Sequence, residues 1–273
     1  MNKNNYRLLV IDIDGTLINK DSTVSAENRE ALGQARAKGI DVCLSTGRTV
    51  RSCRSIIEQL SLDGYHIFFD GALVSNTDNS EHVHIRPLEK TLVSEMVDFA
   101  RVNDIDLELA SATQYFTERE TWSTDIKRRF FDIETTIGDL SLPCKSEDIV
   151  RLDIVVSSPA EKTRAGLFMD YFNGRTAFSQ AHSPQFPDVT FINVIATGTS
   201  KGEALKTLVS HLGISLEEVV AVGDWVNDIS LLSAAGLGIA MGNAHEDLKA
   251  MADHVTLDVA EHGLAAAVKE FLL

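Results

Sequence analysis

The chain has 273 residues, enough for one large domain or two ordinary ones, and 44% of them are hydrophobic, which suits a protein with a sizeable core. The formal net charge of −15 argues against nucleic acid as a partner, because proteins that bind nucleic acid usually carry a basic patch. Three cysteines without metal-ligand spacing, a polar start with no signal-peptide core behind it, and no apolar run of ~18 residues predict a cytoplasmic protein with no membrane partner.

The first predicted strand lies within Leu8–Leu17 and ends in two acids. Four apolar residues run without alternation, as in a parallel strand buried on both faces. Asp12 and Asp14 follow where the strand should end, which is where ligands collect in an open α/β sheet. Two carboxylates this close repel each other unless a cation lies between them, so we expect a magnesium ion held by carboxylates and waters. The alternative is a solvated turn, since Asp and Gly are common turn residues.

Two further strand–helix units are predicted before residue 72. Ser25 is expected to cap a helix that ends at Gly39, and residues 40–44 form the second strand. A helix over residues 50–60 and a third strand at residues 65–69 follow. Strand–helix units in succession predict a right-handed parallel sheet and therefore an α/β fold.

A polar segment, Ser45-Thr46-Gly47-Arg48, follows the second strand. The Ser45 hydroxyl and the backbone amides after it could bind phosphate oxygens, although an ordinary helix N-cap explains the same residues. Arg48 either pairs with an anion or lies on the surface of a helix.

The pattern changes from about residue 85. We expect residues 85–194 to form a second α/β domain inserted into the first, which residues 1–84 and 195–273 build, because a segment of about 110 residues is far longer than a loop. Its predicted helices cover residues 88–102, 122–131 and 160–172, and its strands cover 105–110, 114–117, 149–156, 176–178 and 189–195.

The first pattern resumes near residue 199. Thr199 or Ser200 is expected to cap a helix over residues 201–211, and a buried strand at 219–222 leads into Gly223-Asp224. Further helices are predicted at residues 229–235, 244–252 and 264–272, and further strands at 237–241 and 255–257.

Asp224 follows an apolar strand as Asp12 does, so it could be a third side chain that holds the metal. Asn227 and Asp228 come within one helical turn and could face the same cleft. Asp228 would orient Lys201, whose place at a helix N-terminus is electrostatically unfavourable unless an anion such as phosphate binds there. The alternative for Lys201 is a surface lysine with its charge in water.

Together these residues predict phosphoryl transfer, which needs positioning and charge neutralisation more than covalent machinery. Asp12 would attack phosphorus as an ionised carboxylate and form an aspartyl phosphate. Asp14 would protonate the leaving alcohol and then take a proton from the attacking water. Magnesium would neutralise charge on the transferring group, and Ser45 and Lys201 would bind the remaining phosphate oxygens.

Four motifs of the chain resemble those of the haloacid dehalogenase superfamily. They are Asp12-Ile13-Asp14-Gly15-Thr16-Leu17, Ser45-Thr46-Gly47-Arg48, Lys201-Gly202, and Gly223-Asp224 with Asn227-Asp228. The resemblance implies a Rossmann-like core, magnesium and an aspartyl-phosphate intermediate. It also implies that Asp12 and Asp224 bind the metal by their side chains and Asp14 by its backbone carbonyl, with Asn227 near the phosphate. The insert resembles the substrate-selecting cap of the Cof-type sugar-phosphatase branch.

For two features of the sequence, Asp70 and a basic cluster in the insert, both a functional and an ordinary structural role are possible. At Asp70-Gly71-Ala72 the Cof-type branch usually has asparagine before the glycine, so the charge of Asp70 could weaken phosphate affinity, or it could be solvated without effect. The insert carries a basic cluster that could recognise an anionic substrate, but a charged helix face is the preferred interpretation. This cluster consists of Arg119, Lys127, Arg128 and Arg129.

We therefore expect a magnesium-dependent phosphatase that hydrolyses small phosphorylated metabolites, sugar phosphates first, with the cap closing to exclude water. A phosphomutase or phosphotransferase would form the same intermediate but return the phosphoryl group to a sugar. The non-enzymatic alternatives are a receiver-type regulator phosphorylated on aspartate and a phosphate-binding protein without catalysis. No oligomeric state is predicted.

Overall fold

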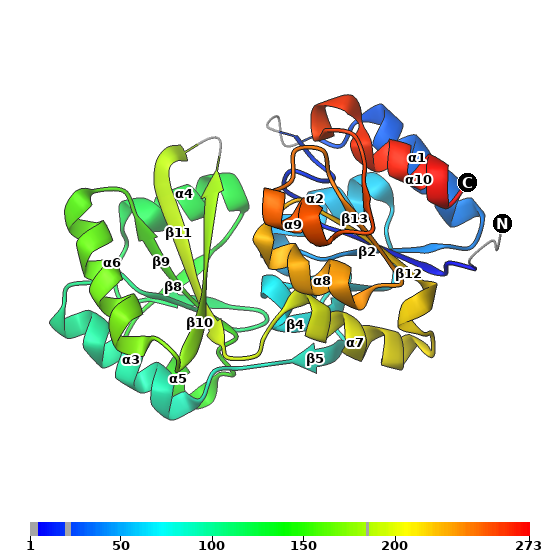
Figure 1. Cartoon of the computed structure of the whole chain (residues 1–273). Coiled ribbons are helices and arrows are strands. Elements are labelled where there is room, and N and C mark those ends of the chain that lie inside the picture. The colour runs from blue at the N-terminus through cyan, green and yellow to red at the C-terminus, as the bar shows by residue number, and fades with distance from the viewer. Residues whose placement is uncertain (1–4, 20–22, 184–185) are drawn as a thin grey trace. The chain divides into compact units, whose positions relative to one another are not determined.

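The computed structural model describes residues 5–19, 23–183 and 186–273, so the polar start at residues 1–4 lies outside the described residues. The chain divides into two compact units, which are Met1–His84 with Ser200–Leu273, and Ile85–Thr199 (Figure 1). The second division falls after Thr199 rather than after residue 194, because strand β11 (Phe186–Ala196) continues past the expected boundary.

A five-stranded parallel sheet forms the centre of the first unit, in the order β14-β13-β12-β1-β2. Every residue of β1 is buried, as its unbroken apolar run predicts, and Val10 at its middle pairs with Cys43 on one side and Ala221 on the other. The strands are β1 (Leu8–Ile11), β2 (Asp41–Leu44), β12 (Val219–Gly223), β13 (Leu237–Ala240) and β14 (His254–Val255). This confirms the predicted α/β class with a parallel core.

Helices cover both faces of the sheet. Figure 1 shows α1 packed beside α10 on one face, while α7 and α8 pack together on the other. Ser25 caps α1 by accepting a hydrogen bond from the Asn28 amide, and Ser200 rather than Thr199 caps α7 by accepting one from the Glu203 amide. The helices are α1 (Ala26–Ala37), α2 (Val50–Leu60), α7 (Lys201–Leu212), α8 (Ile229–Ala234), α9 (Glu246–Met251) and α10 (Gly263–Phe271), with short 3₁₀ turns at Phe69–Gly71, Leu216–Glu218, Val226–Asp228 and Val259–Glu261.

The third predicted strand does not extend the parallel sheet as a strand–helix unit. It is β3 (Tyr65–Phe68), which belongs to a three-stranded sheet with β4 (Leu73–Asn76) and β5 (His82–Ile85) and meets the end of β2 through a single parallel bridge, Ser45 to Ile67. The prediction of three successive units is wrong here because the backbone at Phe69–Gly71 has positive φ and turns the chain straight back into antiparallel β4.

A six-stranded sheet forms the second unit, in the order β10-β11-β9-β6-β7-β8. The apolar core on this sheet includes Leu152 of β9 and Phe168 and Phe172 of α6. The strands are β6 (Glu108–Ala110), β7 (Tyr115–Thr117), β8 (Thr135–Ile137), β9 (Arg151–Val156), β10 (Thr176–Ser183) and β11, and the helices are α3 (Lys90–Val102), α4 (Trp122–Phe131), α5 (Pro143–Ser146) and α6 (Pro159–Phe172). The sequence did not predict β8 and α5, which are short. Among the described residues, no helix combines the length and apolar character needed to cross a membrane.

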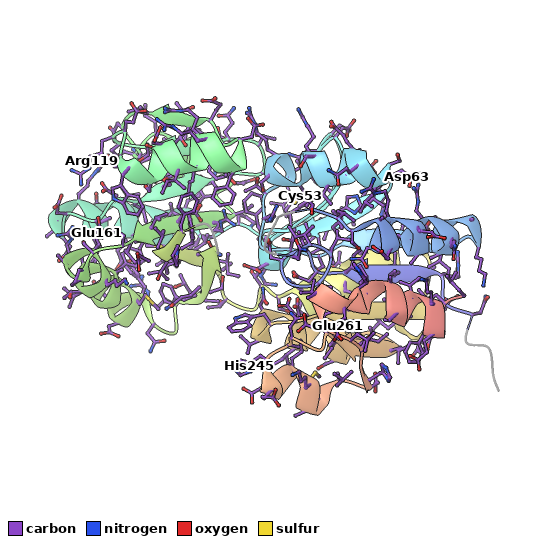
Figure 2. All side chains as sticks on the ribbon, turned by 90° about the horizontal axis from the view of Figure 1, so that it is seen from above. Cys53, Asp63, Arg119, Glu161, His245 and Glu261 are labelled. Atoms are coloured by element: carbon purple, nitrogen blue, oxygen red, sulfur yellow. The ribbon has the colours of Figure 1, made fainter. Side chains whose placement is uncertain are left out.

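The basic cluster of the second unit is not one solvated helix face. Lys127 is 3% exposed, and its Nζ lies 2.8 Å from Asp153 Oδ2 and 3.1 Å from Glu108 Oε2. Arg119, by contrast, lies at the outer edge of the unit, where it pairs with surface aspartates (Figure 2). The prediction of a charged surface face is therefore wrong for Lys127.

Candidate active site

Three neighbouring strands of the parallel sheet end in polar residues. Asp12 follows β1, Ser45 follows β2 and Asp224 follows β12. The backbone hydrogen bonds between neighbouring strands continue one residue beyond β1 and β2. The Asp12 amide donates to Val222 O (3.0 Å), and the Ser45 amide donates to Ile11 O (2.8 Å). The carboxyl edge of the sheet therefore brings together residues that are far apart in the chain, as the strand-end argument predicts.

Lys201, the first residue of α7, is the cation of this group. Its side chain is 1% exposed, and its Nζ lies 2.6 Å from both Asp12 Oδ1 and Asp228 Oδ1. The alternative of a surface lysine is therefore wrong. Burial alone would lower the pKa of Lys201, but Asp12 and Asp228 outweigh burial and raise it, so the lysine is charged. The two carboxylates also offset the unfavourable position of a cation at a helix N-terminus.

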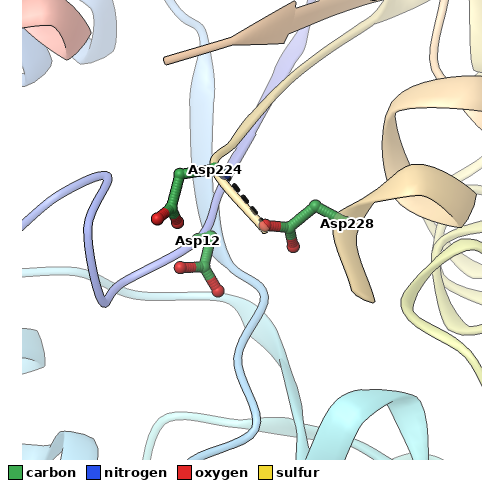
Figure 3. Close-up of side chains that lie close together, drawn as sticks. All are labelled: Asp12, Asp224 and Asp228. Atoms are coloured by element: carbon green, nitrogen blue, oxygen red, sulfur yellow. Dashed lines mark hydrogen bonds between the residues drawn. The ribbon is translucent and has the colours of Figure 1, made fainter. Parts of the chain in front are cut away.

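Asp228 positions the lysine from the other side. It is fully buried, and its Oδ2 accepts hydrogen bonds from the backbone amides of Asp224 (3.0 Å) and Trp225 (3.1 Å). Figure 3 shows Asp12, Asp224 and Asp228 gathered at one place, with the dashed line marking the contact between Asp228 and the Asp224 amide. Because both oxygens of Asp228 have protein partners, its role in this structure is to hold Lys201 and the turn after β12.

Asp224 and Asp12 carry charge that the protein only partly neutralises. Oxygens of Asp12, Asp224 and Asp228 lie within 4.8 Å of one another. Burial and then the neighbouring Asp228 raise the pKa of Asp224 to about 7. Burial also raises the pKa of Asp12, against the opposing effect of Lys201. Such a group of carboxylates is more stable with a divalent cation beside it.

Asp14 pairs with Arg48 rather than joining the carboxylate group. Its side chain is 60% exposed, and Arg48 binds it through both oxygens, Nε to Oδ2 at 2.8 Å and one terminal nitrogen to Oδ1 at 2.6 Å. Arg48 precedes α2, whose N-cap is Thr49, so Arg48 is not a helix-surface residue. The sequence left the partner of Arg48 open, and the structure assigns it to Asp14.

A second group of polar residues follows β2 and β3. The Ser45 hydroxyl is buried and has no hydrogen-bond partner among the described residues. Asp70 is 6% exposed, its amide donates to Thr46 O (3.0 Å), and its Oδ1 accepts a hydrogen bond from Asn227 Nδ2 (3.0 Å). The alternative of a solvated Asp70 is therefore wrong. Asp70 therefore connects Asn227 to the Ser45–Gly47 segment by hydrogen bonds to both.

Two contributing residues had no role in the sequence analysis. Thr16 donates its hydroxyl to Asp224 Oδ1 (3.2 Å), which joins the loop after β1 to the loop after β12. Asn243 donates to Gly15 O (2.9 Å) and accepts from the Val259 amide (2.9 Å). Thr16 lies inside the first motif and could have been found there, whereas no local pattern marks Asn243.

Comparison with known proteins decides the family. The family model for haloacid dehalogenase-like hydrolases matches residues 9–268. The chain belongs to this family. It is similar to the phosphatase YwpJ of Bacillus subtilis, with 34% identity over 97% of this chain and 100% of that protein. It is also similar to the 5-amino-6-(5-phospho-D-ribitylamino)uracil phosphatase YcsE of Bacillus subtilis, with 30% identity over 98% of this chain and 96% of that protein.

Solved structures of haloacid dehalogenase-like hydrolases share the fold of the whole chain. One from Bacteroides thetaiotaomicron has a TM-score of 0.83 and 26% identity, covering 97% of this chain and 99% of that one. One from B. subtilis has a TM-score of 0.78 and 30% identity, covering 97% of this chain and all of that one. The resemblance seen in the four motifs is thereby confirmed, and the protein is an enzyme of the phosphatase and phosphotransferase class within this family.

Proposed function

We propose that this protein hydrolyses small phosphomonoesters, with Asp12 as the nucleophile and Mg²⁺ as the cofactor. The observation that carries the proposal is the buried contact between Lys201 and Asp12, at the carboxyl edge of the sheet. The Lys201 charge opposes the effect of burial on the pKa of Asp12 and so favours the ionised carboxylate, which is the form that attacks phosphorus without a separate base.

The residues present fit a magnesium ion. Asp228 has both oxygens occupied, which leaves Asp12 and Asp224 as the side chains that would hold the ion. The family resemblance adds the backbone carbonyl of Asp14. The raised pKa values of Asp12 and Asp224 come from burial and from repulsion by neighbouring carboxylates. A divalent cation would offset both effects. When bound, the ion supplies positive charge that neutralises the transferring phosphoryl group.

The phosphoryl group would be bound by donors on both sides of Asp12. The unpartnered Ser45 hydroxyl and the charged Lys201 would contact its oxygens, since an anion would satisfy the buried hydroxyl. Asn227 would support this cradle from the turn after β12. We call Ser45, Thr46, Gly47, Lys201 and Asn227 the phosphate cradle.

In the proposed reaction, an oxygen of Asp12 bonds to phosphorus while the bond to the ester oxygen breaks. The leaving alcohol takes a proton from Asp14, and Asp12 becomes an aspartyl phosphate. Water then attacks phosphorus, Asp14 accepts a proton from that water, and Asp12 is regenerated with release of inorganic phosphate. Arg48 holds the Asp14 carboxylate through both of its oxygens and would fix its orientation for these proton transfers.

We propose further that the second unit acts as the cap that selects the substrate, and that sugar phosphates are among the substrates. The name of YcsE states a phosphorylated ribityl compound as its substrate, so phosphorylated polyols belong in the first set of compounds tested.

The test is release of inorganic phosphate from a panel of sugar, polyol and nucleoside monophosphates. We expect release by the wild-type protein in Mg²⁺, none in chelator, and none by Asp12→Asn. The matched control is Asp63→Asn, which makes the same change at an exposed aspartate paired with Arg36. Accumulation of an isomeric sugar phosphate without phosphate release would contradict hydrolysis and support a mutase.

A further inference from the structure

Asp70 is a buried acid beside the phosphate cradle, and the proposed reaction does not use it. Its backbone has φ of 54°, in the left-handed region, so the residue turns its side chain inward at the end of β3. Its Oδ1 accepts the hydrogen bond from Asn227 Nδ2 at 3.0 Å. An amide-for-carboxylate replacement would keep this acceptor, so the contact with Asn227 by itself does not require a charge.

The carboxylate of Asp70 lies against residues of the phosphate cradle. A Cβ added to Gly47 would lie 3.0 Å from both carboxylate oxygens of Asp70, so the carboxylate lies directly against the loop after β2. A Cβ added to Gly71 would lie 2.3 Å from Ser200 O and 3.0 Å from the Lys201 amide. Asp70 therefore lies between the loop after β2 and Asn227, and the next residue, Gly71, lies against the start of α7. Its charge also reaches the lysine, since Asp70 helps to raise the pKa of Lys201.

Without Asp70, the charges at this site would balance once Mg²⁺ is bound. The described acids of the site are Asp12, Asp14, Asp224 and Asp228, and the cations beside them are Lys201 and Arg48. Mg²⁺ would add two positive charges to these two cations, against four carboxylates, so Asp70 supplies the excess negative charge. A buried carboxylate beside the cradle opposes the binding of a phosphate dianion by Coulomb repulsion. Asp70 adds such a charge at a place where a neutral acceptor would make the same hydrogen bond.

We propose that Asp70 determines the affinity of the cradle, weakening the binding of phosphate dianion so that inorganic phosphate leaves readily. The inference rests on the proposed function, because it takes the cradle to be the phosphate site. It assigns Asp70 an electrostatic role, in addition to positioning Asn227.

The experiment measures binding of inorganic phosphate to the full chain in Mg²⁺ by isothermal titration calorimetry. Asp70→Asn removes the charge, keeps an acceptor for Asn227 and tolerates the left-handed backbone. We expect its Kd for phosphate to fall by roughly tenfold, since a unit charge a few Å away in a partly buried site is worth at least that much. The inhibition constant of phosphate in turnover should fall in parallel. Asp63→Asn, the remote control, should leave both constants unchanged.

Asp70→Ala separates charge from positioning, because it removes both the charge and the acceptor. Tighter phosphate binding by Asp70→Asn, with Asp70→Ala weaker than Asp70→Asn, supports the inference. An unchanged or weaker Kd in Asp70→Asn overturns it, as does the lack of phosphate binding by both Asp70→Asn and wild type. Because the readout is binding, it is independent of turnover. A protein that binds phosphate but releases none from the ester panel would contradict the proposed function and still answer the question about Asp70.

Discussion

Lys201 Nζ lies 2.6 Å from Asp12 Oδ1, although the two residues are 189 positions apart in the chain. One residue follows the first strand and the other begins the helix that comes after the second unit. Both are buried, so neither charge is solvated by water to any useful extent. The contact therefore joins the two separated segments of the first unit at the place where the chemistry is proposed.

Removing this lysine should destabilise the protein as well as stop the reaction. Lys201→Met leaves Asp12 and Asp228 buried without their common cation, and we expect the free energy of unfolding to fall by about 3–5 kcal/mol. Urea unfolding followed by tryptophan fluorescence measures it. Lys206→Met is the matched control on the same helix, because its exposed pair with Glu203 is worth about 0–1 kcal/mol. Equal effects of the two variants would contradict the account of Lys201.

The metal-free protein should lose stability as pH rises. The pKa of Asp224 is raised from 3.8 to about 7, so the folded state binds more protons than the unfolded state between these values. Unfolding free energy then decreases as pH increases through this window. In chelator, we expect a lower Tm at pH 8 than at pH 6, with a smaller difference in Asp224→Asn.

Magnesium should reverse that loss, since it binds the ionised carboxylates of the folded state. Adding Mg²⁺ at pH 8 is expected to raise the Tm of the wild-type protein and to have little effect on Asp224→Asn. A wild-type Tm that does not respond to Mg²⁺ would speak against Asp224 as a ligand.

The buried ion pairs of Lys127 should matter for the second unit. Lys127→Met leaves Glu108 without a buried cation, while Asp153 keeps its buried pair with Arg151, so we expect a loss of about 3 kcal/mol of unfolding free energy. Arg129→Met, which breaks an exposed pair with Asp125 on the same helix, should cost about 0–1 kcal/mol. If the two variants unfold at the same urea concentration, the buried pairs contribute no more than a surface pair.

Local sequence patterns were sufficient to predict the buried strands of the parallel sheet. The apolar runs of β1, β2 and β12 identified three neighbouring strands of the parallel sheet, and the polar residues after them identified the edge where they meet. The prediction was wrong for β3, because hydrophobic pattern does not distinguish a strand that continues a parallel sheet from one that pairs with the next segment.

Long-range electrostatic partners were harder to predict. Lys127 looked like part of a surface stripe because helical periodicity does not reveal that Glu108 and Asp153, paired across two strands, lie beneath it. Asp70 likewise has a distant partner, since Asn227, which donates a hydrogen bond to it, comes 157 residues later. The roles of Asp12, Asp14 and Lys201 in the reaction stay predictions, supported by where the structure puts them.

The most direct test of the account is to find the phosphoryl group on Asp12 during turnover. The protein is mixed with its best substrate and Mg²⁺, quenched in acid within milliseconds, digested and analysed by mass spectrometry. We expect a transient phosphorylated peptide that contains Asp12, absent from Asp12→Asn and from a reaction with chelator. Rapid phosphate release with the phosphoryl group on no residue, or on a residue other than Asp12, would contradict the central claim.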